Sequence, residues 1–201
     1  MSAPKSKAKA GPEALSSFAA DSTDHPDFRY IRYYWKQDGP KSGIASAILA
    51  KLTPAGHQAA RHDLLLPESA PGEYSELAHL LDRYDATQPG IERNGYAQFT
   101  IDLPADRPIH AGWEQIRAWV LNYFVRQFDL AAVMVLHIPF RAGSSNPTHI
   151  HILLPARRLG PNGFAFHARA TCSDDGCKEA LIDWQTFSKA DRWLAEPSPP
   201  Q

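Results

Sequence analysis

Two histidines separated by one residue lie in an apolar segment and are well placed to bind a metal ion. His149 and His151 belong to the run Asn-Pro-Thr-His-Ile-His-Ile-Leu-Leu at 146–154. Successive side chains of a β-strand point to opposite faces, so both imidazoles would project from one face. Ile150 and Ile152 would then point into the core. Imidazole nitrogen is a common ligand of divalent metals, and such a pair supplies half of a site.

We expect a third ligand from a neighbouring strand. His137 lies in the apolar run 131–138, and the following segment is long enough to reverse the chain. An antiparallel pairing of the two runs would bring His137 next to the histidine pair. Three neutral imidazoles leave coordination positions open for water or a phosphate oxygen. The alternatives are that the three histidines are unrelated residues of a half-exposed sheet, or that His167, Cys172 and Cys177 form a metal-binding loop instead.

The elements that must position these histidines alternate between strands and helices. Apolar or alternating patterns predict strands, and helical spacing of apolar residues predicts helices. The expected strands are 28–35, 64–67, 97–103, 131–138 and 149–154, and the expected helices are 42–52, 74–84, 113–128 and 180–187. Several connections are too short for the crossovers that parallel strands need. We therefore predict an α+β fold with a mostly antiparallel sheet flanked by helices.

Composition excludes several classes of protein. The chain has 201 residues, 43% of them hydrophobic, which excludes a wholly disordered chain. Two cysteines are too few for a secreted disulfide scaffold, and no apolar run is long enough to cross a membrane. We expect a cytoplasmic protein with a disordered leader at 1–27, one domain at 28–195 and a Pro-rich tail at 196–201.

Positive charge is concentrated in two blocks of the sequence, although the net charge is −1. Residues 29–62 hold six Lys or Arg and one acid, and residues 107–169 hold seven and two. The intervening segment 63–106 is acidic. The two basic blocks would form one positive face if they fold together, or they would scatter over the surface.

The histidine segment resembles the MobA/MobL relaxases of the HUH endonuclease superfamily. The resemblance rests on His137 followed by Asn-Pro-x-His-x-His, and it covers about residues 28–190. Supporting segments are Ala-Arg-Arg-Leu at 156–159, Arg-His-Asp-Leu-Leu-Leu-Pro-Glu at 61–68, Gln-Phe-Thr-Ile-Asp-Leu-Pro at 98–104 and Gly-Phe at 163–164. It implies an HUH relaxase-like fold and a role in plasmid mobilisation or conjugation.

The resemblance also implies a chemistry and its partners. His137, His149 and His151 would hold a divalent metal, Mn²⁺ or Mg²⁺ with Zn²⁺ as an alternative, which polarises a scissile phosphate of single-stranded origin DNA. A tyrosine would attack that phosphate and become joined to it, because a metal offsets the poor nucleophilicity of a phenol. The expected partners are single-stranded DNA and other mobilisation proteins, with no membrane.

The nucleophile of that family has no counterpart at its usual place. There the tyrosine lies on the first helix, after a motif like Gly-Arg-Ser-Ala. The segment 39–45 resembles this motif, but the position seven residues after Ser42 holds Leu49. Acids that the family often carries on the strand before Leu-Pro are replaced by Gln98 and Thr100. Either the nucleophile comes from elsewhere, or the protein binds DNA and metal without cleaving DNA.

Three tyrosines of the first expected strand are the nearest replacements. Tyr30 and Tyr34 would share one face of it and Tyr33 the other, or all three would be packing residues. The arginines expected to contact phosphate are Arg29, Arg32, Arg141, Arg157 and Arg158.

Two other classes fit the histidines less well. HUH single-tyrosine transposases carry their tyrosine after the histidines, whereas no tyrosine follows Tyr123. A metal-binding cupin barrel would need a nearby Glu and a later His on further strands, and the helical pattern at 113–128 counts against it.

Overall fold

The computed structural model of the chain describes residues 15–19, 25, 27–35, 43–54, 58–89 and 93–190. The proposed tail at 196–201 and most of the proposed leader lie outside these residues. In the described part, no helix combines the length and the apolar character needed to span a bilayer.

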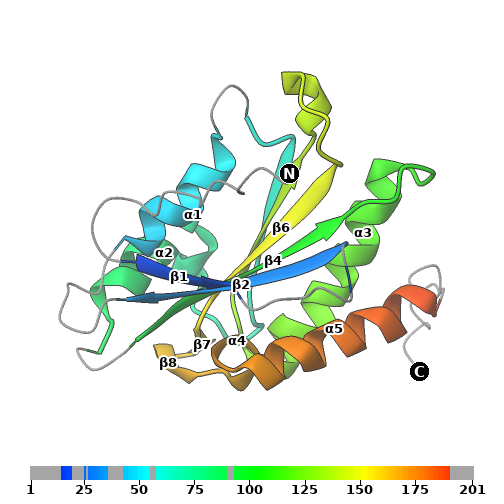
Figure 1. The fold of residues 1–201 in the computed structure, drawn as a ribbon. Helices are drawn as coiled ribbons and strands as arrows, with labels where there is room; N and C mark the ends of the chain where they lie inside the picture. The colour runs from blue at the N-terminus through cyan, green and yellow to red at the C-terminus, as the bar shows by residue number, and fades with distance from the viewer. Residues whose placement is uncertain are drawn as a thin grey trace.

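A six-stranded antiparallel sheet forms the centre of the fold (Figure 1). Its order is β1-β2-β4-β6-β5-β3. The strands are β1 (Leu15–Ala19), β2 (Phe28–Trp35), β3 (Arg61–Leu65), β4 (Asn94–Asp102), β5 (Ala132–His137) and β6 (His149–Pro155). A separate hairpin of β7 (Arg157–Gly160) and β8 (Gly163–His167) follows at the end of β6. The predicted α+β class with a mostly antiparallel sheet is confirmed.

Helices cover both faces of the sheet (Figure 1). On one face lie α1 (Ile44–Leu52), the 3₁₀ turn η1 (Gly72–Ser75) and α2 (Leu77–Ala86). On the other lie α3 (Ile109–Val120), its π-helical continuation η2 (Leu121–Arg126), the short α4 (Arg169–Cys172) and α5 (Asp174–Lys189). A 3₁₀ turn, η3 (Pro139–Ala142), connects β5 to β6.

The strand β5 shows why its sequence is apolar throughout. Met134 and Leu136 pack in the core shared with α3 and α5, whereas Val133 and Val135 pack in the core shared with α1 and α2. Every residue of β5 is buried. A strand covered on both faces loses the alternation of a half-exposed strand and becomes a continuous apolar run.

Most expected elements are present, with shifted ends. The helix expected at 74–84 begins at Leu77, after the turn η1, and the strand expected at 64–67 lies at Arg61–Leu65. One expectation needs correction: the leader was expected to lack regular structure, but its residues 15–19 form β1 against β2. A short edge strand takes its order from the neighbour that it pairs with, so its own sequence pattern is weak.

Candidate metal centre

Three imidazoles meet where β5 ends and β6 begins. His137 lies directly opposite His149 in the antiparallel register, and His151 lies opposite Val135. The ring centroids of His137, His149 and His151 are 4.8–5.3 Å apart. One ligand nitrogen from each ring lies within 4.8 Å of the other two. This group, called the histidine triad below, could therefore hold a metal ion on the α1 side of the sheet.

Hydrogen bonds orient each ring of the histidine triad. Nδ1 of His149 donates to the carbonyl oxygen of Pro147 at 2.9 Å, which leaves Nε2 to face a metal. Nδ1 of His151 lies 2.9 Å from the hydroxyl of Thr100. Nε2 of His137 donates to the carbonyl oxygen of Lys51 at 2.7 Å. Such partners fix the orientation of ligand rings and raise metal affinity.

The surroundings favour the neutral form of His149 and His151. Burial lowers the pKa of His149, and burial together with the charge of Lys51 lowers the pKa of His151 well below its usual value. Neutral imidazole is the form that binds a metal. A set of three imidazole nitrogens fits a divalent ion, and imidazole ligands leave the charge of the ion uncompensated.

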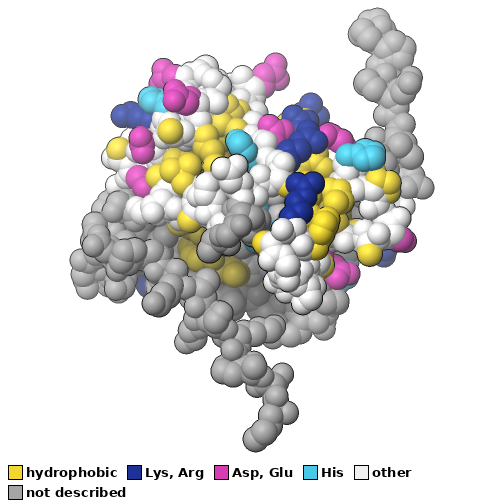
Figure 2. Space-filling model, turned by 90° about the horizontal axis from the view of Figure 1, so that it is seen from above, with side chains coloured by type: hydrophobic (Ala, Val, Ile, Leu, Met, Phe, Trp, Pro, Cys, Tyr) yellow, Lys and Arg dark blue, Asp and Glu magenta, His cyan; other side chains and the backbone are white. Residues whose placement is uncertain are grey.

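Two cationic side chains lie near the triad. The positive charges of Lys51 and Arg29 both disfavour protonation of His149 and His151. Arg29 lies opposite Thr100 and holds Asp102 through two bonds of 2.6 and 2.7 Å. Seen from above, Figure 2 shows Lys and Arg side chains beside histidine side chains, with hydrophobic side chains on both sides. A divalent ion bound by neutral imidazoles would keep its positive charge. Together with Lys51 and Arg29, it would attract a phosphate.

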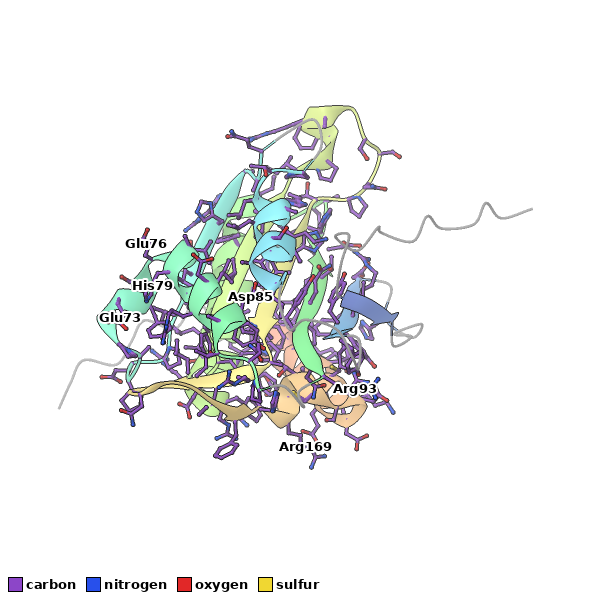
Figure 3. All side chains as sticks on the ribbon, turned by 90° about the vertical axis from the view of Figure 1, so that its left-hand side faces the viewer. Glu73, Glu76, His79, Asp85, Arg93 and Arg169 are labelled. Carbon is purple, nitrogen blue, oxygen red and sulfur yellow. The ribbon has the colours of Figure 1, made fainter. Side chains whose placement is uncertain are left out.

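Hydrogen bonds hold the helix α1 at its start and in its last turn. At its start, Asp85 of α2 accepts hydrogen bonds from the backbone amides of Gly43, Ile44 and Ala45 at 3.1–3.2 Å (Figure 3). In its last turn, the carbonyl of Lys51 holds His137. Leu49, at the place where the resemblance leads one to expect a tyrosine, lies in that same turn and is 40% exposed.

The three tyrosines of β2 do not adjoin the triad. Tyr30 lies opposite Phe99, on the face covered by α3, and Tyr34 lies within reach of Arg32 on that side. Tyr33 shares the face of the triad but lies opposite Tyr96, four positions along β4 from Thr100. Four strand residues span about 13 Å. Tyr33 also stacks on Tyr96 at 4.3 Å, and burial raises its pKa.

The remaining tyrosines are also far from the triad. Tyr96 lies opposite Pro155, at the far end of β6, and the hydroxyl of Tyr84 donates to Gly95 and accepts from Ala156 there. Tyr74 packs on Phe164 of β8, and Tyr123 packs on Trp119 on the opposite face. These positions account for all seven tyrosines of the sequence.

The five expected phosphate contacts divide into two groups. Arg29 lies beside the triad, and Arg141 is exposed on η3, which begins two residues after His137. Arg32 is instead buried on the opposite face, bound to the carbonyl of Cys172 and to Asp174. The hairpin that follows β6 carries Arg157 and Arg158, at the end opposite to the triad.

Arg157 has a structural role that its sequence context did not suggest. It is 6% exposed and donates to the carbonyl oxygens of Thr87, Phe164 and Ala165 at 2.7–2.8 Å. It thereby ties the β7–β8 hairpin to the end of α2. A residue in this position has no exposed guanidinium for phosphate, so the expectation for Arg157 needs correction.

We expect Arg157→Ala to lower the free energy of unfolding by about 3 kcal/mol, because three partly buried hydrogen bonds to carbonyl oxygens are lost together with the packing of a buried side chain. The matched variant Arg158→Ala, at the exposed neighbouring position, should change stability by less than about 0.5 kcal/mol. Urea denaturation measures both. Equal stability of the two variants would contradict the structural role of Arg157.

Sequence reasoning missed two features of the centre. Lys51 lies in no motif, and Asp102 lies in the segment 98–104 without a role expected for it; the fold brings both to the triad. The alternative loop site is not formed, because among the described residues the triad is the group of His, Cys, Asp and Glu that converges.

Comparison with known proteins supports the fold. No family model matches the sequence, and no curated protein matches it. A solved structure described as "Molecular Basis of Vancomycin Resistance Transfer in Staphylococcus aureus" superposes with a TM-score of 0.60. The match covers 80% of this chain and 89% of the other at 13% identity. At this identity the likeness establishes a shared fold.

Proposed function

We propose that this chain is a relaxase-like protein of DNA transfer that binds a divalent metal at the histidine triad and single-stranded DNA across it. The observation that carries this proposal is the convergence of His137, His149 and His151 on one face of paired strands, each ring held by a hydrogen bond. The structural likeness to a protein described in the context of resistance transfer supports it.

The donor set favours some metals over others. A bound divalent ion supplies Lewis-acid polarisation of a phosphate oxygen. Three nitrogen ligands suit Mn²⁺ or Zn²⁺ better than Mg²⁺, which prefers oxygen ligands and keeps its water. Arg29, Arg141 and Lys51 would hold the DNA backbone around the ion through charge-assisted contacts.

The position of the tyrosines favours binding without a tyrosyl intermediate. All seven lie on the opposite face or well along the sheet from the triad. A phenol must reach in-line contact with phosphorus to attack it, and contact of about 3–3.5 Å is required. We therefore propose a protein that binds DNA and metal and forms no phosphotyrosine from its own side chains.

A second candidate is metal-assisted nicking of single-stranded origin DNA through a tyrosyl-phosphate. The observation that favours nicking is the position of Tyr33, which lies on the same face of the sheet as the triad. In this alternative the chain would act with other mobilisation proteins in the cytoplasm. A covalent protein–DNA adduct, lost in Tyr33→Phe, would separate it from the first proposal.

The binding proposal predicts a steep dependence on salt. Anisotropy of a labelled single-stranded oligonucleotide should show weaker binding as salt rises from about 50 to 200 mM, because each neutralised phosphate releases counterions. Arg29→Ala and Arg141→Ala should each lower the slope of log K against log salt by about 0.7, the value for one contact on a single strand. Arg158→Ala, at the far end of the sheet, is the control and should leave the slope unchanged. An affinity for the oligonucleotide that does not change with salt concentration would argue against a DNA-binding surface at the triad.

A further inference from the structure

A cavity of about 270 Å³ lies beside the metal centre, on the α3 side of the sheet. It opens where β2 begins and β4 ends, between the start of α3 and the end of α5. Its apolar wall includes Phe28, Leu103, Ile116 and Trp184, and its polar lining includes Arg107 and Gln115. Cavities with apolar walls and a few fixed polar groups are typical ligand sites.

The cavity and the histidine triad share one structural wall. Asp102 lines the cavity, and its register partner on β6 is His149. The next residue, Leu103, donates its backbone amide to the carbonyl of Thr148 at 2.8 Å. The two sites are thus separated by the paired ends of two strands. Arg29, which lies opposite Thr100 and donates to Asp102, places a guanidinium on the triad side of this wall.

Gln115 gives the cavity a specific hydrogen-bonding pattern. Its side chain is 3% exposed, its Oε1 accepts from Arg107, and its Nε2 donates to the carbonyl of Ser188 at 3.3 Å. A primary amide has two acceptor lone pairs and two N–H donors. The amide is therefore fixed in orientation while one acceptor and one donor position remain for a ligand.

We propose that this cavity binds an adenine base of the single strand whose backbone crosses the histidine triad. A glutamine amide pairs with adenine through the N6 amino group and N7, one bond in each direction. Trp184 and Phe28 supply aromatic surface for a flat ring. The base would leave the stack and enter the cavity, while Arg29 contacts its phosphate. This inference rests on the proposed function.

Binding of short oligonucleotides tests the proposal. With Mn²⁺ present and salt fixed, a labelled dA homopolymer should bind the full chain about tenfold more tightly than dT or dC, as expected for one bidentate pair. Replacing adenine by 7-deazaadenine removes the N7 acceptor and should abolish the preference. Equal affinity for all strands would overturn the adenine site.

Variants separate the cavity from the rest of the surface. Gln115→Met keeps the volume but removes the amide, and Ser188→Phe fills the cavity from α5. Both should remove the preference for dA and retain Mn²⁺ binding. Thr186→Phe adds the same bulk on the exposed side of α5 and should keep the preference. If the Ser188→Phe variant binds Mn²⁺ normally and still prefers dA, the base does not enter this cavity.

A last measurement distinguishes failure of this site from failure of the proposed function. Saturation-transfer NMR of adenosine and thymidine reports binding of the base without DNA. Binding of DNA with neither base preference nor an adenosine signal would overturn the cavity proposal and leave the proposed function standing. An adenosine signal that Ser188→Phe removes, without DNA binding, would support the cavity and overturn the proposed function.

Discussion

The His151→Ala variant is expected to bind Mn²⁺ more than about 100-fold more weakly than the wild-type protein, because loss of a ligand costs more than loss of a supporting hydrogen bond. The ring of His151 lies 4.8 Å from each of the other two rings, and the residue is 9% exposed. Its removal leaves two ligand nitrogens, which cannot enclose the ion. Isothermal titration with Mn²⁺ measures the affinity directly.

Two further variants make this prediction specific. Thr100→Val removes the hydroxyl that lies 2.9 Å from Nδ1 of His151 and should weaken Mn²⁺ binding about 10- to 100-fold. His110→Ala, at an exposed position on α3, is the matched control and should bind as the wild type does. Wild-type affinity in His151→Ala would place the metal elsewhere or show that the triad holds none.

The triad itself could be predicted from the sequence, because the position of each histidine follows from a pattern in its own segment. Period-two alternation placed His149 and His151 on one face, and a turn-rich segment after an apolar run indicated an antiparallel return for His137. The register of His137 opposite His149 is set by the pairing of β5 with β6, which the loop through η3 permits but does not specify. Contacts such as the one between His137 and Lys51 depend on how α1 packs on the sheet, which no local pattern encodes.

The cationic contacts were harder to predict, because charge patterning does not specify a face. Arg157 and Arg158 follow the histidine strand in sequence, yet β6 carries them to its far end, about 20 Å away at strand spacing. Arg32 and Arg29 are neighbours on β2, but alternation sends them to opposite faces. The same alternation left the tyrosines undecided, since the face of β2 that meets the triad is set by its pairing with β4.

The most informative test of chemistry is to introduce a tyrosine at position 49, where the resemblance to relaxases leads one to expect it. We expect the wild-type protein to form no covalent adduct with single-stranded DNA in Mn²⁺, because no tyrosine adjoins the triad. Leu49→Tyr should create one. Leu49 lies in the last turn of α1, half-exposed, two residues before the carbonyl that holds His137. Position 49 is thus within one helical turn of the residue whose carbonyl contacts His137.

The step that Leu49→Tyr would perform is a balanced transesterification. The phenolic oxygen loses its proton to water and forms a bond to phosphorus, the bond from phosphorus to the 3′ oxygen breaks, and that oxygen takes up a proton from water to leave as a 3′ hydroxyl. The expected product is protein joined to a 5′ phosphate, which intact mass spectrometry detects as a discrete mass increase. Leu49→Phe has the same ring without the hydroxyl and should give no adduct.

Ala50→Tyr provides the geometric control, because one residue further along a helix turns the side chain by about 100° at 3.6 residues per turn. Adduct from Leu49→Tyr alone would show that α1 delivers its side chain to the triad and that the site retains the ability to activate a phosphate. Adduct in the wild type, lost in Tyr33→Phe, would instead favour the nicking alternative. If Leu49→Tyr binds metal and DNA but forms no adduct, the phosphate does not lie within reach of α1, and the site binds DNA in a geometry that differs from that of a relaxase.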